Sequence, residues 1–169
     1  HVWHEDLGFR KSRIVNAGVI AAEADYLIFT DGDCIPRRDF VAAHLRFARP
    51  AHYLSGGYYR LPMLTSERIT PDDIRSNAIF NARWLRRAGI PLNHRLLKFH
   101  LSPRTAALCC RFTSTPATFN GMSASAWRED ILRVNGFDER MQYGGLDREL
   151  GERLENFGVR PVQVRYHAL

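Results

Sequence analysis

The chain is poor in cysteine and has no long apolar run. Its three cysteines, Cys34 and the adjacent Cys109 and Cys110, are odd in number and lack the spacing of a disulfide framework or a zinc site. Such usage is typical of a reducing compartment, so we expect a cytoplasmic protein. No apolar segment approaches the length that spans a bilayer, and no signal-peptide pattern is present.

Low-complexity segments, internal repeats and linker-like composition are also missing from the 169 residues. We therefore predict a single domain over residues 1–169. The sequence starts at His1 and enters patterned structure at once. We expect this domain to be an incomplete piece of a longer protein.

Positive charge is in excess, with a formal net charge of +6. This balance favours anionic partners such as nucleotides, phosphorylated lipids, membrane surfaces or nucleic acid. The basic residues are dispersed and no nucleic-acid-binding motif is recognised, so we expect no nucleic-acid partner. A solvated basic surface explains most of the single arginines.

The most informative stretch is a short apolar run, residues 25–30, that leads into Asp31-Gly32-Asp33. Its length and composition predict a buried strand of the parallel type, followed by a tight turn. Two neighbouring carboxylates are costly to hold together unless a cation lies between them, and oxygen ligands suit Mg²⁺ or Mn²⁺. The alternative is an ordinary turn, because Asp and Gly are favoured turn residues.

Helical and extended patterns alternate along the rest of the chain. Apolar periodicity predicts helices over residues 9–24, 39–47, 72–88, 127–134 and 146–157. Short apolar or alternating runs predict strands over residues 52–60, 117–124 and 161–166. This order predicts an α/β fold in which helices pack against one open sheet.

Two basic segments have more than one interpretation. Arg10, Lys11 and Arg13 lie at the start of the first helix, the wrong end for cations, which indicates an anion nearby or three solvated side chains. Residues 94–111 mix basic and apolar side chains. They either contact a membrane surface or a lipid-linked substrate, or form an amphipathic packing element.

Several motifs follow one another in a recognisable order: Gly8-Phe9-Arg10-Lys11, Asp31-Gly32-Asp33, Asn120-Gly121-Met122-Ser123, Asn135-Gly136-Phe137-Asp138-Glu139 and Gly144-Gly145-Leu146-Asp147. Together they resemble a family 2 glycosyltransferase over most of the chain, residues 61–116 being the loosest part. The resemblance implies a GT-A-like open mixed sheet flanked by helices, incomplete at both ends. It also implies an inverting, metal-assisted transfer of a hexosyl or N-acetylhexosaminyl group from a nucleotide-sugar, a UDP-sugar above all, to a hydroxyl group.

The resemblance further implies roles for particular residues. Asp31 and Asp33 correspond to the family's Asp-x-Asp (DXD) motif, which holds Mn²⁺ or Mg²⁺ and the donor. Arg10 and Lys11 correspond to a basic segment on the donor side. Asp147 corresponds to the general base.

The acceptor side is implied in the same way. It includes Asn120, Gly121 and Glu149, although Glu149 is equally suited to the first turn of a helix. The acceptor would be a glycan or glycolipid, such as a cell-envelope polysaccharide, met at the inner face of the cell membrane through peripheral contact.

Departures from the family keep a second interpretation open. Leu146 stands where many relatives carry a Glu, and the family's nucleotide-binding strands would precede His1. His167 is not assigned as a metal ligand. The alternative function is a non-catalytic nucleotide- or glycan-binding fragment, or a degenerate relative.

Overall fold

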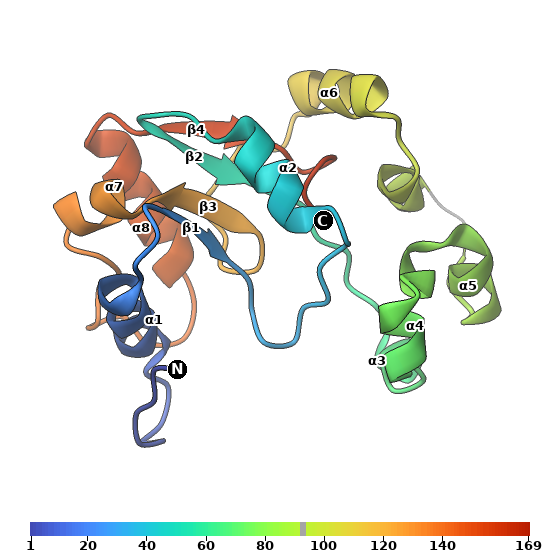
Figure 1. The fold of residues 1–169 in the computed structure, drawn as a ribbon, viewed down its shortest axis with the longest axis horizontal. Helices are drawn as coiled ribbons and strands as arrows, with labels where there is room; N and C mark the ends of the chain where they lie inside the picture. Colours follow the sequence, from blue (N-terminus) through green and yellow to red (C-terminus); the bar gives the residue numbers. More distant parts are fainter. Residues whose placement is uncertain (92–93) are drawn as a thin grey trace.

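The computed structural model describes residues 1–91 and 94–169 and shows a mixed α/β architecture (Figure 1). The described residues form one four-stranded sheet, in the order β1-β3-β2-β4. Its strands are β1 (Tyr26–Phe29), β2 (His52–Ser55), β3 (Ala124–Trp127) and β4 (Arg160–Gln163). β3 runs antiparallel to β1 and β2, and β2 runs parallel to β4. The prediction of an open mixed sheet flanked by helices is confirmed at this level.

The alternation of side chains along β1 places an apolar layer on each face of the sheet. Leu27 and Phe29 point into one cluster and Ile28 into another. The first cluster is covered by helices α1 (Lys11–Ala21), α7 (Arg128–Arg133) and α8 (Leu146–Asn156), and the second by α2 (Phe40–Phe47).

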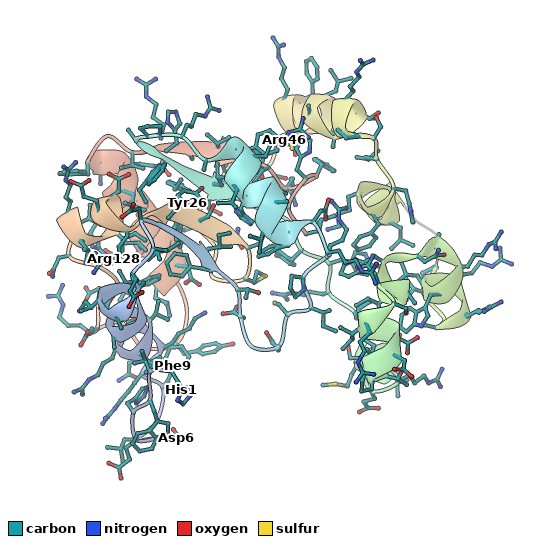
Figure 2. The ribbon with its side chains drawn as sticks, in the orientation of Figure 1. His1, Asp6, Phe9, Tyr26, Arg46 and Arg128 are labelled. Carbon is teal, nitrogen blue, oxygen red and sulfur yellow. The ribbon has the colours of Figure 1, made fainter. Side chains whose placement is uncertain are left out.

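Arg128 joins the first layer of helices to the sheet. It follows β3 directly, and its guanidinium donates hydrogen bonds to the carbonyls of Val19 and Ile20, at 2.8 and 2.9 Å (Figure 2). A cation at the C-terminal end of α1 also interacts favourably with the helix dipole.

The chain between β2 and β3 forms a helical arm, residues 57–112, that extends away from the sheet (Figure 1). Its helices are α3 (Met63–Ser66), α4 (Pro71–Arg75), η1 (Ala78–Phe80), α5 (Ala82–Arg87), η2 (His94–Phe99) and α6 (Pro103–Phe112). The arm has its own apolar cluster around Leu85, Ile90 and Leu96.

The predicted helix over residues 72–88 is wrong, because the chain breaks twice within it. Asn77 has a left-handed φ of 60°, which a short polar side chain tolerates. Asn81 is extended and its side chain accepts a hydrogen bond from the Arg83 N–H at 2.8 Å, which starts α5 anew.

The predicted strands also need correction. β1 is half-buried and antiparallel to β3, not a buried parallel strand. The strand expected over residues 117–124 begins only at Ala124 and ends at Trp127, where a helix was expected to start. Ala124-Ser125-Ala126 has little intrinsic β propensity, and its place between β1 and β2 makes it a strand. The last strand covers residues 160–163 in place of 161–166.

Among the described residues, none of the helices has the length and apolar character needed to cross a bilayer. Cys34, Cys109 and Cys110 are free thiols.

Candidate functional site

Three charged side chains from separate elements meet in what we call the lysine–carboxylate cluster: Lys11, Asp31 and Asp147. Lys11 Nζ, at the start of α1, lies 2.6 Å from Asp31 Oδ1 and 3.9 Å from Asp147 Oδ2. Asp31 follows β1, and Asp147 is in the first turn of α8. The anion expected near the start of the first helix is therefore a pair of the protein's own carboxylates.

Gly121 closes the cluster from a fourth segment. A Cβ at this position would lie 2.8 Å from Asp147 Oδ1 and 2.9 Å from Lys11 Nζ, so the backbone approaches closely only because it carries no side chain. The preceding Asn120 holds the turn, since its Oδ1 accepts a hydrogen bond from the Ser123 N–H at 2.8 Å.

Burial raises the pKa of Asp147 above its ordinary value of 3.8, and the charge of Asp31 adds to this effect. Lys11 and the Gly121 amide lower the same pKa, but burial outweighs them. Asp147 Oδ1 is buried and makes no hydrogen bond within the described residues. The arrangement gives a carboxylate of increased basicity, one oxygen of which is buried without a hydrogen-bond partner among the described residues.

The acids also act on Lys11. Burial lowers the pKa of this amine, but the bond to Asp31 and the charges of Asp147, Asp31 and Asp33 raise it by more. Lys11 is therefore held as a cation between the two carboxylates of the cluster.

The turn after β1 carries the second acid, Asp33, which is exposed. The Cys34 N–H donates to the Asp31 carbonyl at 3.1 Å, and Cys34 Sγ lies 3.7 Å from Asp33 Oδ1. Burial and the negative charges of Asp33 and Asp31 raise the pKa of the Cys34 thiol. Cys34 is thus a weakly nucleophilic thiol, and the turn presents carboxylate oxygens.

A cavity of about 810 Å³ lies between this turn and the helical arm. Asp31, Asp33 and Cys34 line its polar end. The arm contributes apolar and aromatic walls, including Tyr58, Tyr59, Ile69, Ile79, Phe80 and Phe99. We call this cavity the arm cleft; its volume suits a small-molecule or oligosaccharide ligand.

Other predicted site residues lie apart from the cluster. Arg10 is the residue before α1 and is half-buried. Glu149 Oε2 accepts a hydrogen bond from Arg153 Nη2 at 2.7 Å, on α8, and lines a separate cavity of about 650 Å³. Arg153 also donates hydrogen bonds to the carbonyls of Val134 and Gly136, in the turn after α7. Glu149 and Arg153 therefore fix this turn against α8, and we call the pair the α8 clamp.

Asn16 is a positioning residue that the sequence pattern did not indicate. Its Oδ1 accepts from the Phe137 N–H at 2.7 Å, and its Nδ2 donates to the Phe137 carbonyl at 2.8 Å. Gly136 has a positive φ of 65°, and a Cβ there would lie 2.5 Å from Asn16 Oδ1. These contacts hold the turn that leads to α8 against α1. In the sequence, only the Asn-Gly-Phe-Asp motif at residues 135–138 indicated a turn, and it did not indicate that Asn16 would hold it.

A metal ion at the turn after β1 would depend on Asp31 and Asp33. Within the described part of the chain, no three His, Cys, Asp or Glu side chains are grouped to hold a metal by themselves. Asp31 is paired with Lys11, whereas Asp33 is exposed. Carboxylate oxygens are ligands that a divalent cation accepts, but with Asp31 paired to Lys11 a cation here would need ligand oxygens and water to complete its coordination. His167 packs its ring against Phe47, with centroids 4.6 Å apart.

Comparison with known proteins identifies neither a matching family model nor a significantly similar curated protein.

Proposed function

We propose that the chain is the central and C-terminal part of a family 2 glycosyltransferase domain with a GT-A-like fold. It transfers a sugar from a nucleotide-sugar, a UDP-sugar in the first instance, to a hydroxyl of a glycan or glycolipid. One observation carries the proposal. Lys11, Asp31, Gly121 and Asp147 come from four motifs spread along the sequence, and the fold brings them to a single point.

Asp147 acts as the general base. The acceptor oxygen forms a bond to the anomeric carbon of the donor as the bond from that carbon to the diphosphate breaks, and Asp147 takes the hydroxyl proton. A raised pKa makes its carboxylate a better proton acceptor at neutral pH. Oδ1 is buried, so an acceptor would approach the part of the Asp147 side chain that remains exposed. A single displacement of this kind inverts the configuration at the anomeric carbon.

Asp33 and Asp31 would hold Mn²⁺ or Mg²⁺ together with the donor diphosphate. When bound, the cation stabilises the negative charge that develops on the departing diphosphate. Lys11 already neutralises Asp31, so Asp33 contributes most to recruiting the metal. Arg10 adds a further cation on the donor side.

The arm cleft is lined by Asp31 and Asp33 at the turn and by aromatic and apolar side chains of the arm, so it adjoins the donor acids. The acceptor would extend from this cleft toward Asp147, which does not itself line it. Asn120 and Gly121 border the acceptor near Asp147. Glu149 is held by Arg153, so we assign it to the α8 clamp and not to the acceptor. A cell-envelope polysaccharide built at the inner face of the membrane fits such a cleft.

A non-catalytic nucleotide- or glycan-binding role is the second candidate. The Lys11–Asp31 ion pair favours it, because a carboxylate already paired with an amine binds a metal less readily. A measurable rate of sugar transfer, which Asp147→Asn abolishes, excludes this role.

The proposal is tested by calorimetric titration of UDP with and without Mn²⁺, using the wild type, Asp33→Ala and Glu152→Ala. Glu152 is an exposed acid on α8, so Glu152→Ala removes the same negative charge as Asp33→Ala but at a distance from the turn after β1. We expect Mn²⁺-dependent UDP binding in the wild type and in Glu152→Ala, and a loss of roughly tenfold or more in Asp33→Ala. Binding that is independent of Mn²⁺, or equal in all three proteins, contradicts the assignment.

A further inference from the structure

Helix α6 exposes basic and apolar side chains together on its outer face. Arg104, Leu108, Arg111 and Phe112 recur at intervals that place them on one side of the helix. All four are exposed, with Leu108 at 57% and Phe112 at 74% of their full accessible areas. Exposed apolar side chains also occur on α2, at Val41 and Leu45, but on α6 they share their face with two arginines.

The other side of α6 already has a partner. Ala106 is buried and Cys109 and Cys110 are half-buried. Burial raises the pKa of the Cys110 thiol and the Tyr166 backbone lowers it by less, so Cys110 lies near the chain that follows β4. Figure 2 shows the outer side chains of α6 projecting away from the rest of the molecule. Leu108 and Phe112 are therefore not among the side chains through which α6 packs against the rest of the protein.

Charge is segregated in the same part of the chain. Residues 57–112 contain ten Lys and Arg against three Asp and Glu, a net charge of +7. The remaining residues contain fourteen Lys and Arg against fifteen Asp and Glu, a net charge of −1. The helical arm thus accounts for all of the excess positive charge of +6.

We propose that the outer face of α6 binds an anionic membrane surface. Leu108 and Phe112 enter the boundary between headgroups and acyl chains, and Arg104 and Arg111 remain at the level of the lipid phosphates. The net charge of the arm complements such a surface, since each Lys or Arg near it adds to the attraction. This inference does not depend on the sugar-transfer reaction.

The test is co-sedimentation of the whole chain with vesicles of equal parts phosphatidylcholine and phosphatidylglycerol, beside vesicles of phosphatidylcholine alone. We expect binding to the anionic vesicles that weakens as salt is added. The Arg104→Gln/Arg111→Gln variant should lower the partition coefficient roughly 10- to 30-fold, and Leu108→Gln/Phe112→Gln at least roughly tenfold.

A matched control lies on α2, where Val41 and Leu45 are each 56% exposed. Val41→Gln/Leu45→Gln also replaces two exposed apolar side chains with glutamine, but outside the arm. Its partition coefficient should stay within about twofold of the wild-type value. Absence of wild-type binding to anionic vesicles overturns the proposal, as does an equal loss in the α2 control. A dimer on gel filtration that only the α6 apolar variant abolishes also overturns it, by assigning the face to a second copy. Circular dichroism verifies that each variant is folded.

Discussion

At the residue scale, Lys11 lies where a helix start normally favours anions, and α1 has no acid in its first turn. The bond to Asp31 and the approach of Asp147 offset this unfavourable position. The cluster is therefore a structural contact between α1, the turn after β1 and α8, as well as the proposed reaction centre.

Replacing Asp147 with Asn should stabilise the fold at neutral pH. Burial raises the pKa of this carboxyl above 3.8, so the folded state holds the proton more tightly than the unfolded chain and the ionised form costs stability. We expect the free energy of unfolding to increase by about 0.5–1 kcal/mol at neutral pH. The gain should disappear as the pH falls through the raised pKa toward 3.8, where the wild-type carboxyl is also neutral.

Urea unfolding at several pH values measures this difference, with the exposed Glu152→Gln as the control for charge. In the proposed function, Asp147→Asn also lowers the transfer rate roughly 100-fold or more while UDP binding persists. A variant less stable than the wild type at neutral pH shows that the Lys11 contact outweighs burial.

The sequence singled out Asp31, Asp33 and Asp147 because they stand in motifs with a chemical rationale, and the structure brings two of them, Asp31 and Asp147, together at Lys11. Asn16 could not be found from the sequence. Its partner, Phe137, is distant in sequence, and a polar residue inside a helical pattern gives no sign of what it contacts. Nothing in the sequence indicated either that Glu149 pairs with Arg153 on α8, a contact that competes with the predicted role at the acceptor.

At the scale of elements, the break at Asn77 is the clearest departure from local pattern. Its left-handed conformation separates α4 from η1, although the apolar periodicity continues through it. The segment after Asn77 packs into the apolar cluster of the arm around Leu85. These tertiary contacts outweigh the local helical periodicity.

Asn77→Ala and Asn77→Gly should therefore differ in stability. We expect the alanine variant to lose roughly 1 kcal/mol, because a Cβ disfavours positive φ, and the glycine variant to lose little or gain slightly. Urea unfolding measures both. An alanine variant that is equally stable and more helical by circular dichroism contradicts this, since it shows that a continuous helix is accessible.

Side-chain size alone did not decide how well strands were predicted, since the strand predicted over residues 52–60 ends at Ser55 despite Tyr58 and Tyr59. Residues 26–29 have bulky side chains and were placed correctly. Ala124-Ser125-Ala126 is a strand because it pairs on both sides, with Ile28 and Leu54 each opposite Ser125. Such pairing arises from segments that are distant in sequence, and no local pattern reports it.

At the scale of the whole molecule, the arm and the sheet have separate apolar clusters. Leu85 lies in the arm cluster and Leu150 in the core beneath the sheet, and both are buried. This separation lets the arm open locally without loss of the sheet.

The same Leu→Ala substitution, made once in the arm and once in the core, tests this separation. Leu85→Ala should increase amide hydrogen exchange in residues 57–112 and leave β1 to β4 protected. Leu150→Ala should lower the global free energy of unfolding by about 2–5 kcal/mol and increase exchange throughout. Increased exchange of the strands in Leu85→Ala to the same extent shows instead that arm and sheet unfold as one unit.

The register of the central strands has one more consequence. Ser55 pairs with Ala124, and the Gly56 N–H donates to the Ser123 carbonyl at 2.7 Å, so the arm leaves the sheet and rejoins it at one place. Without the arm, β2 and β3 are the two halves of a hairpin that a short turn can close. The length and sequence of the arm can therefore change independently of the strands, and with them the shape of the cleft. Under the proposed function, acceptor preference could diverge by exchange of this one inserted segment while Lys11, Asp31 and Asp147 stay in place.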